Sequence, residues 1–286
     1  MRVASFERDG KPGYGIVVAN GIIDAGRRLR AAAPDLRALL AQDALDELHA
    51  IASEAEADFP LAEVRFAPVI PNPDKILCVG LNYRAHVEET GRETPRYTIL
   101  FTRFPASQTG HGQPLVRPSV SDKFDFEGEL AVVIGRRGRH IPETGALRHV
   151  AGYACFNDGS VRDYQRHGSQ FTPGKNFVRS GSFGPWLTTA EEIGDPAELT
   201  LETRLNGEIM QAAPLSDLIF SVPALIAYCS TFTELVPGDV IATGTPGGVG
   251  FARKPPRYLK PGDTIEIDID GLGVLRNTVI NESDTL

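Results

Sequence analysis

The chain has 286 residues, with 29 Lys and Arg against 37 Asp and Glu, and a formal net charge of −8 at pH 7. This acidic balance argues against nucleic acid as a partner, because binding to phosphates needs clustered cations. The sequence has no apolar run of about 18 residues that could cross a membrane, and its charged start, MRVASFERDGK, is unlike a signal peptide. We therefore expect a cytoplasmic globular protein of one or two domains.

Three cysteines, Cys78, Cys155 and Cys229, are scattered through apolar stretches. They are too few and too far apart for a disulfide framework or a CxxC zinc site. We expect them to be small residues of the core.

Residues 1–70 are expected to form a small α+β module. The segments RVASF and YGIVVANGIID predict short strands, with a hairpin turn at Asn20-Gly21. Asp35 is placed to cap a helix that begins at the next residue, and apolar spacing predicts a second helix over about 43–55. Four prolines then predict a linker over 56–73.

Residues 71–286 are expected to form a second, larger domain, and most of its apolar runs are typical of strands. Helices are predicted only over Val222–Thr231 and, from a weaker pattern, over Pro142–Val150. The pattern predicts an α+β, β-rich fold with many turns. The expected strands lie within residues 75–81, 98–104, 124–135, 199–211, 239–246 and 263–280.

The stretch FDFEGELAVVIG carries the strongest chemical signal. On a strand, Glu127 and Glu129 share one face, because alternate side chains point the same way. Neighbouring carboxylates repel each other unless they are exposed or share a cation. A solvated strand end and a pair of hard ligands for Mg²⁺, Mn²⁺ or Ca²⁺ both fit this fragment. Asp158, which follows an apolar run, is a candidate third ligand or a turn residue.

His86 and Glu89 lie three residues apart in NYRAHVEE, so a helical turn would place them on one face. Such a pair can orient an imidazole that activates water. The same spacing is also common on solvated helices, so this fragment leaves both interpretations open. The charged segment GRETPR that follows is typical of a mobile surface segment and could serve as a lid.

Two further fragments could contact an anion. In GTPGGVG, Gly244 allows close approach of backbone N–H groups and Thr245 adds a hydroxyl, but the P-loop ending is missing. Lys175, in FTPGKNF, is either a lysine whose stem packs on apolar residues or a group that recognises a carboxylate.

Taken together, the fragments resemble the fumarylacetoacetate hydrolase family, and within it the acylpyruvase and 2-hydroxyhepta-2,4-diene-1,7-dioate isomerase type of member. The resemblance covers roughly 75–285. It implies a mixed β-sandwich roll, preceded by the small module, and commonly a homodimer. The matching pieces, in chain order, are KILCVGLNYRAHVEE, FDFEGELAVVIG, AGYACFNDGSVRD, FTPGKNF, FGPWL, RLNGE, LSDLIFSVPALIAY, PGDVIATGTPGGVG, LKPGD and GLGVLRNTV.

The resemblance also implies a cofactor and a catalytic pair. One Mg²⁺ or Mn²⁺ ion per chain would be bound by Glu127, Glu129 and Asp158. His86 and Glu89 would form the dyad that activates water when the lid closes.

Substrate contacts follow from the same resemblance. Lys175 matches a lysine near the metal and the substrate carboxylate, and Thr245 matches a substrate-contacting residue beside Gly244 in the glycine turn. Arg162 and Gln170 are weaker candidates for substrate binding in the same region.

From these residues we hypothesise a metal-dependent hydrolase that cleaves a carbon–carbon bond in a β-diketo acid such as an acylpyruvate. Its partner would be a small anionic keto acid, with His86 deprotonating the attacking water. A 2-oxo acid decarboxylase or a keto–enol isomerase is the alternative, because both use the same metal-held enolate. A non-catalytic metabolite-binding scaffold is the remaining alternative.

Overall fold

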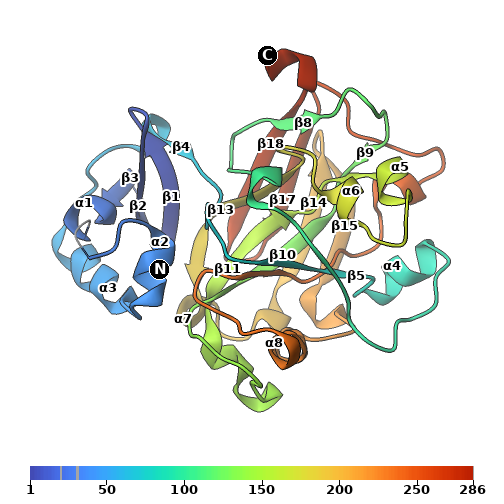
Figure 1. Ribbon diagram of the computed structural model, residues 1–286. Coiled ribbons are helices and arrows are strands. Elements are labelled where there is room, and N and C mark those ends of the chain that lie inside the picture. Colours follow the sequence, from blue (N-terminus) through green and yellow to red (C-terminus); the bar gives the residue numbers. More distant parts are fainter. Residues whose placement is uncertain (20, 30–31, 286) are drawn as a thin grey trace.

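The computed structural model describes residues 1–19, 21–29 and 32–285, and β-strands dominate it (Figure 1). The main sheet has the order β3-β2-β1-β13-β11-β10-β16-β5-β6, with β4 beside β1 and β7 beside β13. Its strands are β1 (Arg2–Arg8), β2 (Lys11–Val18), β3 (Gly21–Asp24), β4 (Arg65–Phe66), β5 (Ile76–Gly80), β6 (Ile99–Thr102), β7 (Gln108–Thr109), β10 (Gly128–Ile134), β11 (Val150–Asn157), β13 (Gly181–Thr189) and β16 (Val240–Ala242).

A second sheet has the order β15-β14-β17-β18-β8, and β12 pairs with β9 in a separate two-stranded ladder. The arrangement is the β-rich α+β fold expected from the sequence. The strands of these two groups are β8 (Leu115–Arg117), β9 (Phe124–Asp125), β12 (Ser160–Val161), β14 (Thr200–Leu205), β15 (Glu208–Pro214), β17 (Thr264–Ile269) and β18 (Gly273–Asn281).

The helices are short, and none that the structure describes is long and apolar enough to span a bilayer. Asp35 caps its helix as predicted, with its side chain accepting a bond of 2.7 Å from the N–H of Ala38. The predicted helix over 142–150 is instead a 3₁₀ segment, Glu143–His149, with Gly145 weakening its α-helical propensity. The α-helices are α1 (Ala25–Leu29), α2 (Leu36–Ala41), α3 (Leu45–Glu54), α4 (Arg84–Glu89), α5 (Arg162–Gln165), α6 (Thr172–Lys175), α7 (Ala190–Ile193) and α8 (Val222–Phe232).

The N-terminal elements, blue in Figure 1, lie to one side of the molecule but share the main sheet. Strand β1 pairs with β13, with Arg2 opposite Thr188, and β4 forms within the segment expected to be a linker. β2 and β3 form the expected antiparallel pair. Asn20, in the predicted turn between them, lies outside the described residues.

Strand β10 is buried on both faces, because it lies between two hydrophobic clusters. Ala131 and Val133 belong to the cluster that contains the leucines of α2. Leu130 and Val132 belong to the cluster that contains α8 and residues of the second sheet. Burying one such large apolar side chain contributes roughly 1.5–3 kcal/mol, so β10 is held firmly. The three cysteines are free and buried, as predicted.

The turn that leads into α4 is fixed by one buried amide. The side chain of Asn82 donates to the carbonyl oxygens of Thr243, at 2.8 Å, and Phe220, at 3.0 Å. Its Oδ1 accepts from the N–H of Phe220 at 2.7 Å. These bonds tie the start of α4 to the end of β16 and to the entry of α8.

Asn82→Ala should lower the free energy of unfolding by about 2–4 kcal/mol, because buried backbone groups lose their partners. Urea denaturation of the wild type and the variant measures this difference. Asn82→Asp, which places a carboxylate oxygen against both carbonyl oxygens, should destabilise the protein at neutral pH at least as much as Asn82→Ala. An Ala variant as stable as the wild type would contradict this role.

Candidate metal centre and active site

Three buried carboxylates meet where β10 begins and β11 ends. Glu127, Glu129 and Asp158 each place one oxygen within 4.8 Å of the others, and all three are buried. Strand pairing explains the meeting: Gly128 lies opposite Asn157 in the ladder, so the two strand ends are neighbours. The structure thus brings the three predicted metal ligands together.

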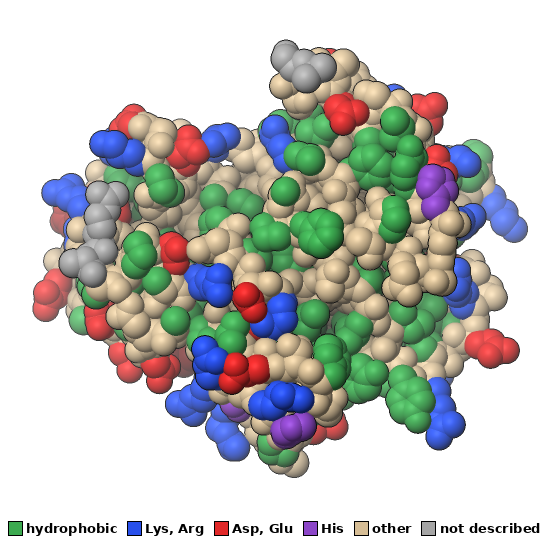
Figure 2. Space-filling view, in the orientation of Figure 1, with side chains coloured by type: hydrophobic (Ala, Val, Ile, Leu, Met, Phe, Trp, Pro, Cys, Tyr) green, Lys and Arg blue, Asp and Glu red, His purple; other side chains and the backbone are tan. Residues whose placement is uncertain are grey.

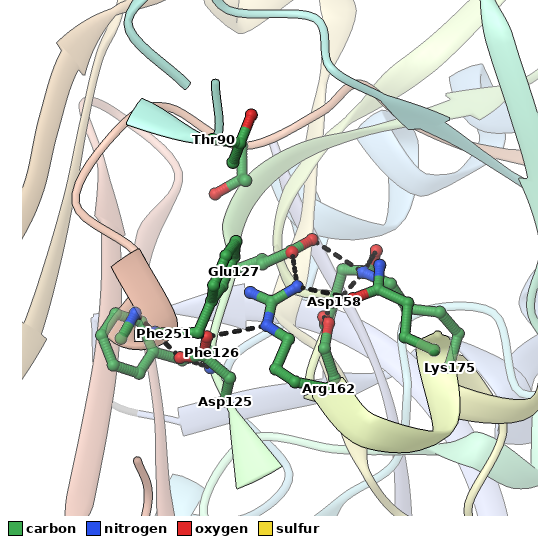
Figure 3. Close-up of polar contacts among 12 residues, drawn as sticks. Thr90, Asp125, Phe126, Glu127, Asp158, Arg162, Lys175 and Phe251 are labelled. Carbon is green, nitrogen blue, oxygen red and sulfur yellow. Dashed lines mark hydrogen bonds and ion pairs between the residues drawn. The ribbon is translucent and has the colours of Figure 1, made fainter. Parts of the chain in front are cut away.

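Cations surround two of these carboxylates (Figure 3). The Lys175 ammonium, which is 1% exposed, lies 2.7 Å from Glu127 Oε2 and 2.6 Å from Asp158 Oδ2. Arg162 donates to Glu127 Oε1 at 2.6 Å, and Arg103 donates to Asp158 Oδ1 at 2.6 Å. The charges of Glu127 and Asp158 are therefore compensated within the protein.

Burial raises the pKa of Glu127, but Lys175 and Arg162 outweigh burial and hold that pKa well below its usual range. For Glu129, burial and the negative charges of Asp158 and Glu127 raise the pKa well above its ordinary value. Burial lowers the pKa of Lys175, yet Asp158 and Glu127 more than reverse this, so its net pKa is raised and the lysine stays protonated.

This donor set fits a divalent cation that prefers oxygen. The cluster contains carboxylates alone, without the imidazole or thiolate that would favour softer metals. Glu129 accepts one N–H bond, from Gly244 at 2.9 Å, and it has no ion pair within the described part of the chain. A bound cation would supply the positive charge that Glu129 otherwise lacks.

The predicted dyad is formed on α4. His86 Nδ1 lies 2.7 Å from Glu89 Oε1, and Glu89 Oε2 accepts from the N–H of Gly248 at 2.8 Å. An ionised Glu89 can only accept, so Nδ1 carries the proton and Nε2 is left as the basic nitrogen. Gly248 has φ +106°, and a Cβ there would lie 2.1 Å from the carbonyl oxygen of Met210. Only glycine suits this position.

His86, Glu127 and Glu129 line one cavity of about 600 Å³, whereas their partners Glu89 and Asp158 are not among its lining residues. Gly244 does not line the cavity, but its N–H donates to Glu129, which does. The hydroxyl of Thr245 donates to the carbonyl oxygen of Gly128. Gln170 is exposed and is not among the lining residues, whereas Gln165 on α5 is. The predicted site residues that line the cavity are His86, Glu127, Glu129, Arg162, Lys175 and Thr245.

Sequence reasoning missed several supporting residues. Asp125 accepts from Arg162 Nε at 2.8 Å and from the N–H groups of Gly250 and Phe251, both at 2.9 Å. Asp125 lies in the same FDFEGE stretch as Glu127 and Glu129, and this position could have marked it as part of the site. Arg103 was also visible, as the one cation in the apolar run TILFTRF. Phe251, which follows the glycine turn, carried no signal.

Glu129→Gln should stabilise the metal-free protein by about 1–3 kcal/mol at neutral pH and abolish stabilisation by Mn²⁺. A carboxylate whose folded-state pKa is raised contributes stability at low pH, and this contribution is lost as the pH rises through that pKa. Glu129→Gln cannot ionise at this position, so its stability does not fall in this way as the pH rises. Thermal unfolding with chelator and with Mn²⁺, over a pH series, tests this.

Glu143→Gln, an exposed glutamate outside the cluster, is the control and should behave as the wild type. The interpretation fails if Glu129→Gln still gains wild-type stability from Mn²⁺.

Several known proteins are similar to this chain in sequence and in fold. The model of the fumarylacetoacetate hydrolase C-terminal domain matches residues 75–280. The chain is 44% identical over 225 residues to oxaloacetate tautomerase YisK of Bacillus subtilis, covering 77% of this chain and 75% of that protein. It is 43% identical over 223 residues to the human mitochondrial oxaloacetate tautomerase FAHD2A, covering 77% and 71%.

One similar crystal structure is that of maleylpyruvate hydrolase from Sphingobium sp. SYK-6 in complex with manganese(II) and pyruvate. Its TM-score is 0.82 at 30% identity, and the match covers 98% of this chain and 99% of that one. With the domain match and the tautomerase relatives, this places the chain in the fumarylacetoacetate hydrolase family.

Proposed function

We propose that the protein is a divalent-metal-dependent keto–enol tautomerase of a short 2-oxo acid of the oxaloacetate type. The observation that carries the proposal is that two of the three clustered carboxylates, Glu127 and Glu129, line one cavity together with the basic His86, in a chain that is 42–44% identical to oxaloacetate tautomerases. This function corresponds to the isomerase alternative of the sequence analysis rather than to hydrolysis.

Mg²⁺ or Mn²⁺ would be held by Glu127, Glu129 and Asp158. Bound there, the ion would polarise the 2-oxo group and acidify the neighbouring C–H bond. Arg162 has a buried Nη2 with no hydrogen-bond partner among the described residues, and it lines the cavity. It is therefore a ready donor for a substrate oxygen.

His86 would act as the general base that transfers the proton. Its Nε2 would take the proton from the substrate carbon next to the 2-oxo group. The C–H electron pair would form the enol C=C bond as the π pair of the C=O bond moves to the 2-oxo oxygen. That oxygen would take a proton from water, and the imidazolium would return its proton to the solvent, so that no proton is gained or lost overall. Glu89, held by Gly248, stabilises the imidazolium that forms. Lys175 remains protonated and places positive charge near the oxygen on which negative charge develops.

Hydrolysis of a carbon–carbon bond remains the second candidate, favoured by one observation. The dyad could equally deprotonate a water molecule, and the relative from Sphingobium is named a maleylpyruvate hydrolase. In that reaction the substrate would yield two carboxylic acids. Decarboxylation of a 2-oxo diacid would instead release carbon dioxide, so product identity separates the three outcomes.

The wild type with Mg²⁺ or Mn²⁺ should interconvert the enol and keto forms of oxaloacetate without net loss of the acid. His86→Gln and Glu89→Gln should lower kcat about 10²–10⁴-fold, because general base catalysis is lost. Ultraviolet absorbance follows the enol, and nuclear magnetic resonance identifies the products.

Both variants should keep the Mn²⁺-induced rise in Tm, which shows that the fold and the metal site survive. His49→Gln, an exposed histidine on α3, serves as the control. Unchanged turnover in His86→Gln would refute the role of the dyad. Faster release of two acids from an acylpyruvate than tautomerisation of oxaloacetate would assign the protein to hydrolysis.

A further inference from the structure

Two arginines on the cavity wall have no acidic partner in the described part of the chain. Arg92 lies shortly after α4 and Arg166 directly after α5, and both line the cavity with exposed side chains. Within the described residues, neither guanidinium lies within 4.0 Å of a carboxylate oxygen. Two elements far apart in sequence thus bring uncompensated positive charge to one cavity.

The other two cationic side chains of the cavity wall, Arg162 and Lys175, are ion-paired, although Arg162 keeps one unpartnered nitrogen. Arg162 is paired with Asp125 and Glu127, and Lys175 with Glu127 and Asp158. A divalent ion on the carboxylate cluster would take the chelating end of a 2-oxo acid. The positive charge of Arg92 and Arg166 therefore exceeds what a substrate with a single carboxylate requires.

The ring of Phe251 helps to place Arg166. The guanidinium carbon of Arg166 lies 5.3 Å from the ring centroid, and that of Arg162 lies 4.5 Å from it. Stacking on an aromatic ring leaves the in-plane N–H groups of a guanidinium free to bind a carboxylate. The unpartnered Nη2 of Arg162 adds a buried donor on the same side of the site.

We propose that Arg92 and Arg166 form a second anion subsite that selects 2-oxo acids carrying a second carboxylate. The inference rests on the proposed function, because that function places the 2-oxo end of the substrate at the carboxylate cluster. Arginine binds carboxylates through two parallel N–H bonds, which a neutral acyl tail cannot accept. The two residues thus determine specificity.

Two unreactive ligands test the subsite without turnover. Malate and 2-hydroxybutyrate have the same four-carbon chain and the same chelating 2-hydroxy acid end, and they differ only in a carboxylate or a methyl group at C4. Isothermal titration calorimetry of the Mn²⁺-loaded protein measures both Kd values. The variants are Arg92→Gln and Arg166→Gln. Arg96→Gln is the matched control, because Arg96 is exposed beside Tyr97 and is not among the cavity-lining residues.

The wild type should bind malate about tenfold more tightly than 2-hydroxybutyrate. Arg92→Gln and Arg166→Gln should each weaken malate binding roughly 5–20-fold and change the Kd of 2-hydroxybutyrate less than about twofold. Arg96→Gln should leave both constants unchanged. Equal affinities in the wild type, no malate binding, or equal weakening of both ligands in the two variants would overturn the subsite.

The outcome separates this inference from the proposed function. Selective malate binding without tautomerase activity would reject the proposed function and support the anion subsite. Tautomerase activity without malate selectivity would reject the subsite alone.

Discussion

Three carboxylates buried side by side are the constraint on which the rest of the site depends. Such groups repel each other and lose hydration, so they persist only with compensating charge. Lys175 supplies part of that charge from α6, a helix of only four residues. Arg162 supplies more from α5, which is equally short. Ion pairs to the carboxylates therefore explain why the chain between β12 and β13 folds back over the end of β10.

The same constraint leaves a deficit of positive charge at Glu129, which a bound divalent cation would make up. The dyad is built separately, on α4, and the amide of Gly248 holds it in place. Figure 1 shows α4, α5 and α6 on one side of the molecule, away from the N-terminal elements. On the face seen in Figure 2, charges of both signs are spread around the molecule. The net charge of −8 does not describe the cavity, because more basic than acidic side chains line it.

Much of the site could be predicted, because several of its residues lie close together in the sequence, at spacings typical of a strand or a helix. Alternation on a strand predicts the shared face of Glu127 and Glu129, and helical spacing predicts the pairing of His86 with Glu89. Asp158 needed the family resemblance, since a lone aspartate before a turn has many uses. The fold class followed from strand-like runs and turn residues, and the helix cap at Asp35 followed from its local chemistry.

The remaining features depend on contacts between distant segments. Arg103 reaches Asp158 across 55 positions, and no local pattern encodes that pairing. That Gln165 lines the cavity and Gln170 does not depends on how the chain runs on after α5. The shared sheet of β1 and β13 likewise joins residues almost 190 positions apart, such as Arg2 and Thr188. Proximity in space, rather than sequence spacing, decides these cases.

An anomalous difference map from crystals soaked in Mn²⁺ tests the central claim most directly. The account predicts one strong peak per chain, within bonding distance of Glu127, Glu129 and Asp158 and inside the cavity that His86 lines. No peak at these carboxylates under saturating Mn²⁺, or a peak bound only by surface residues, would contradict it.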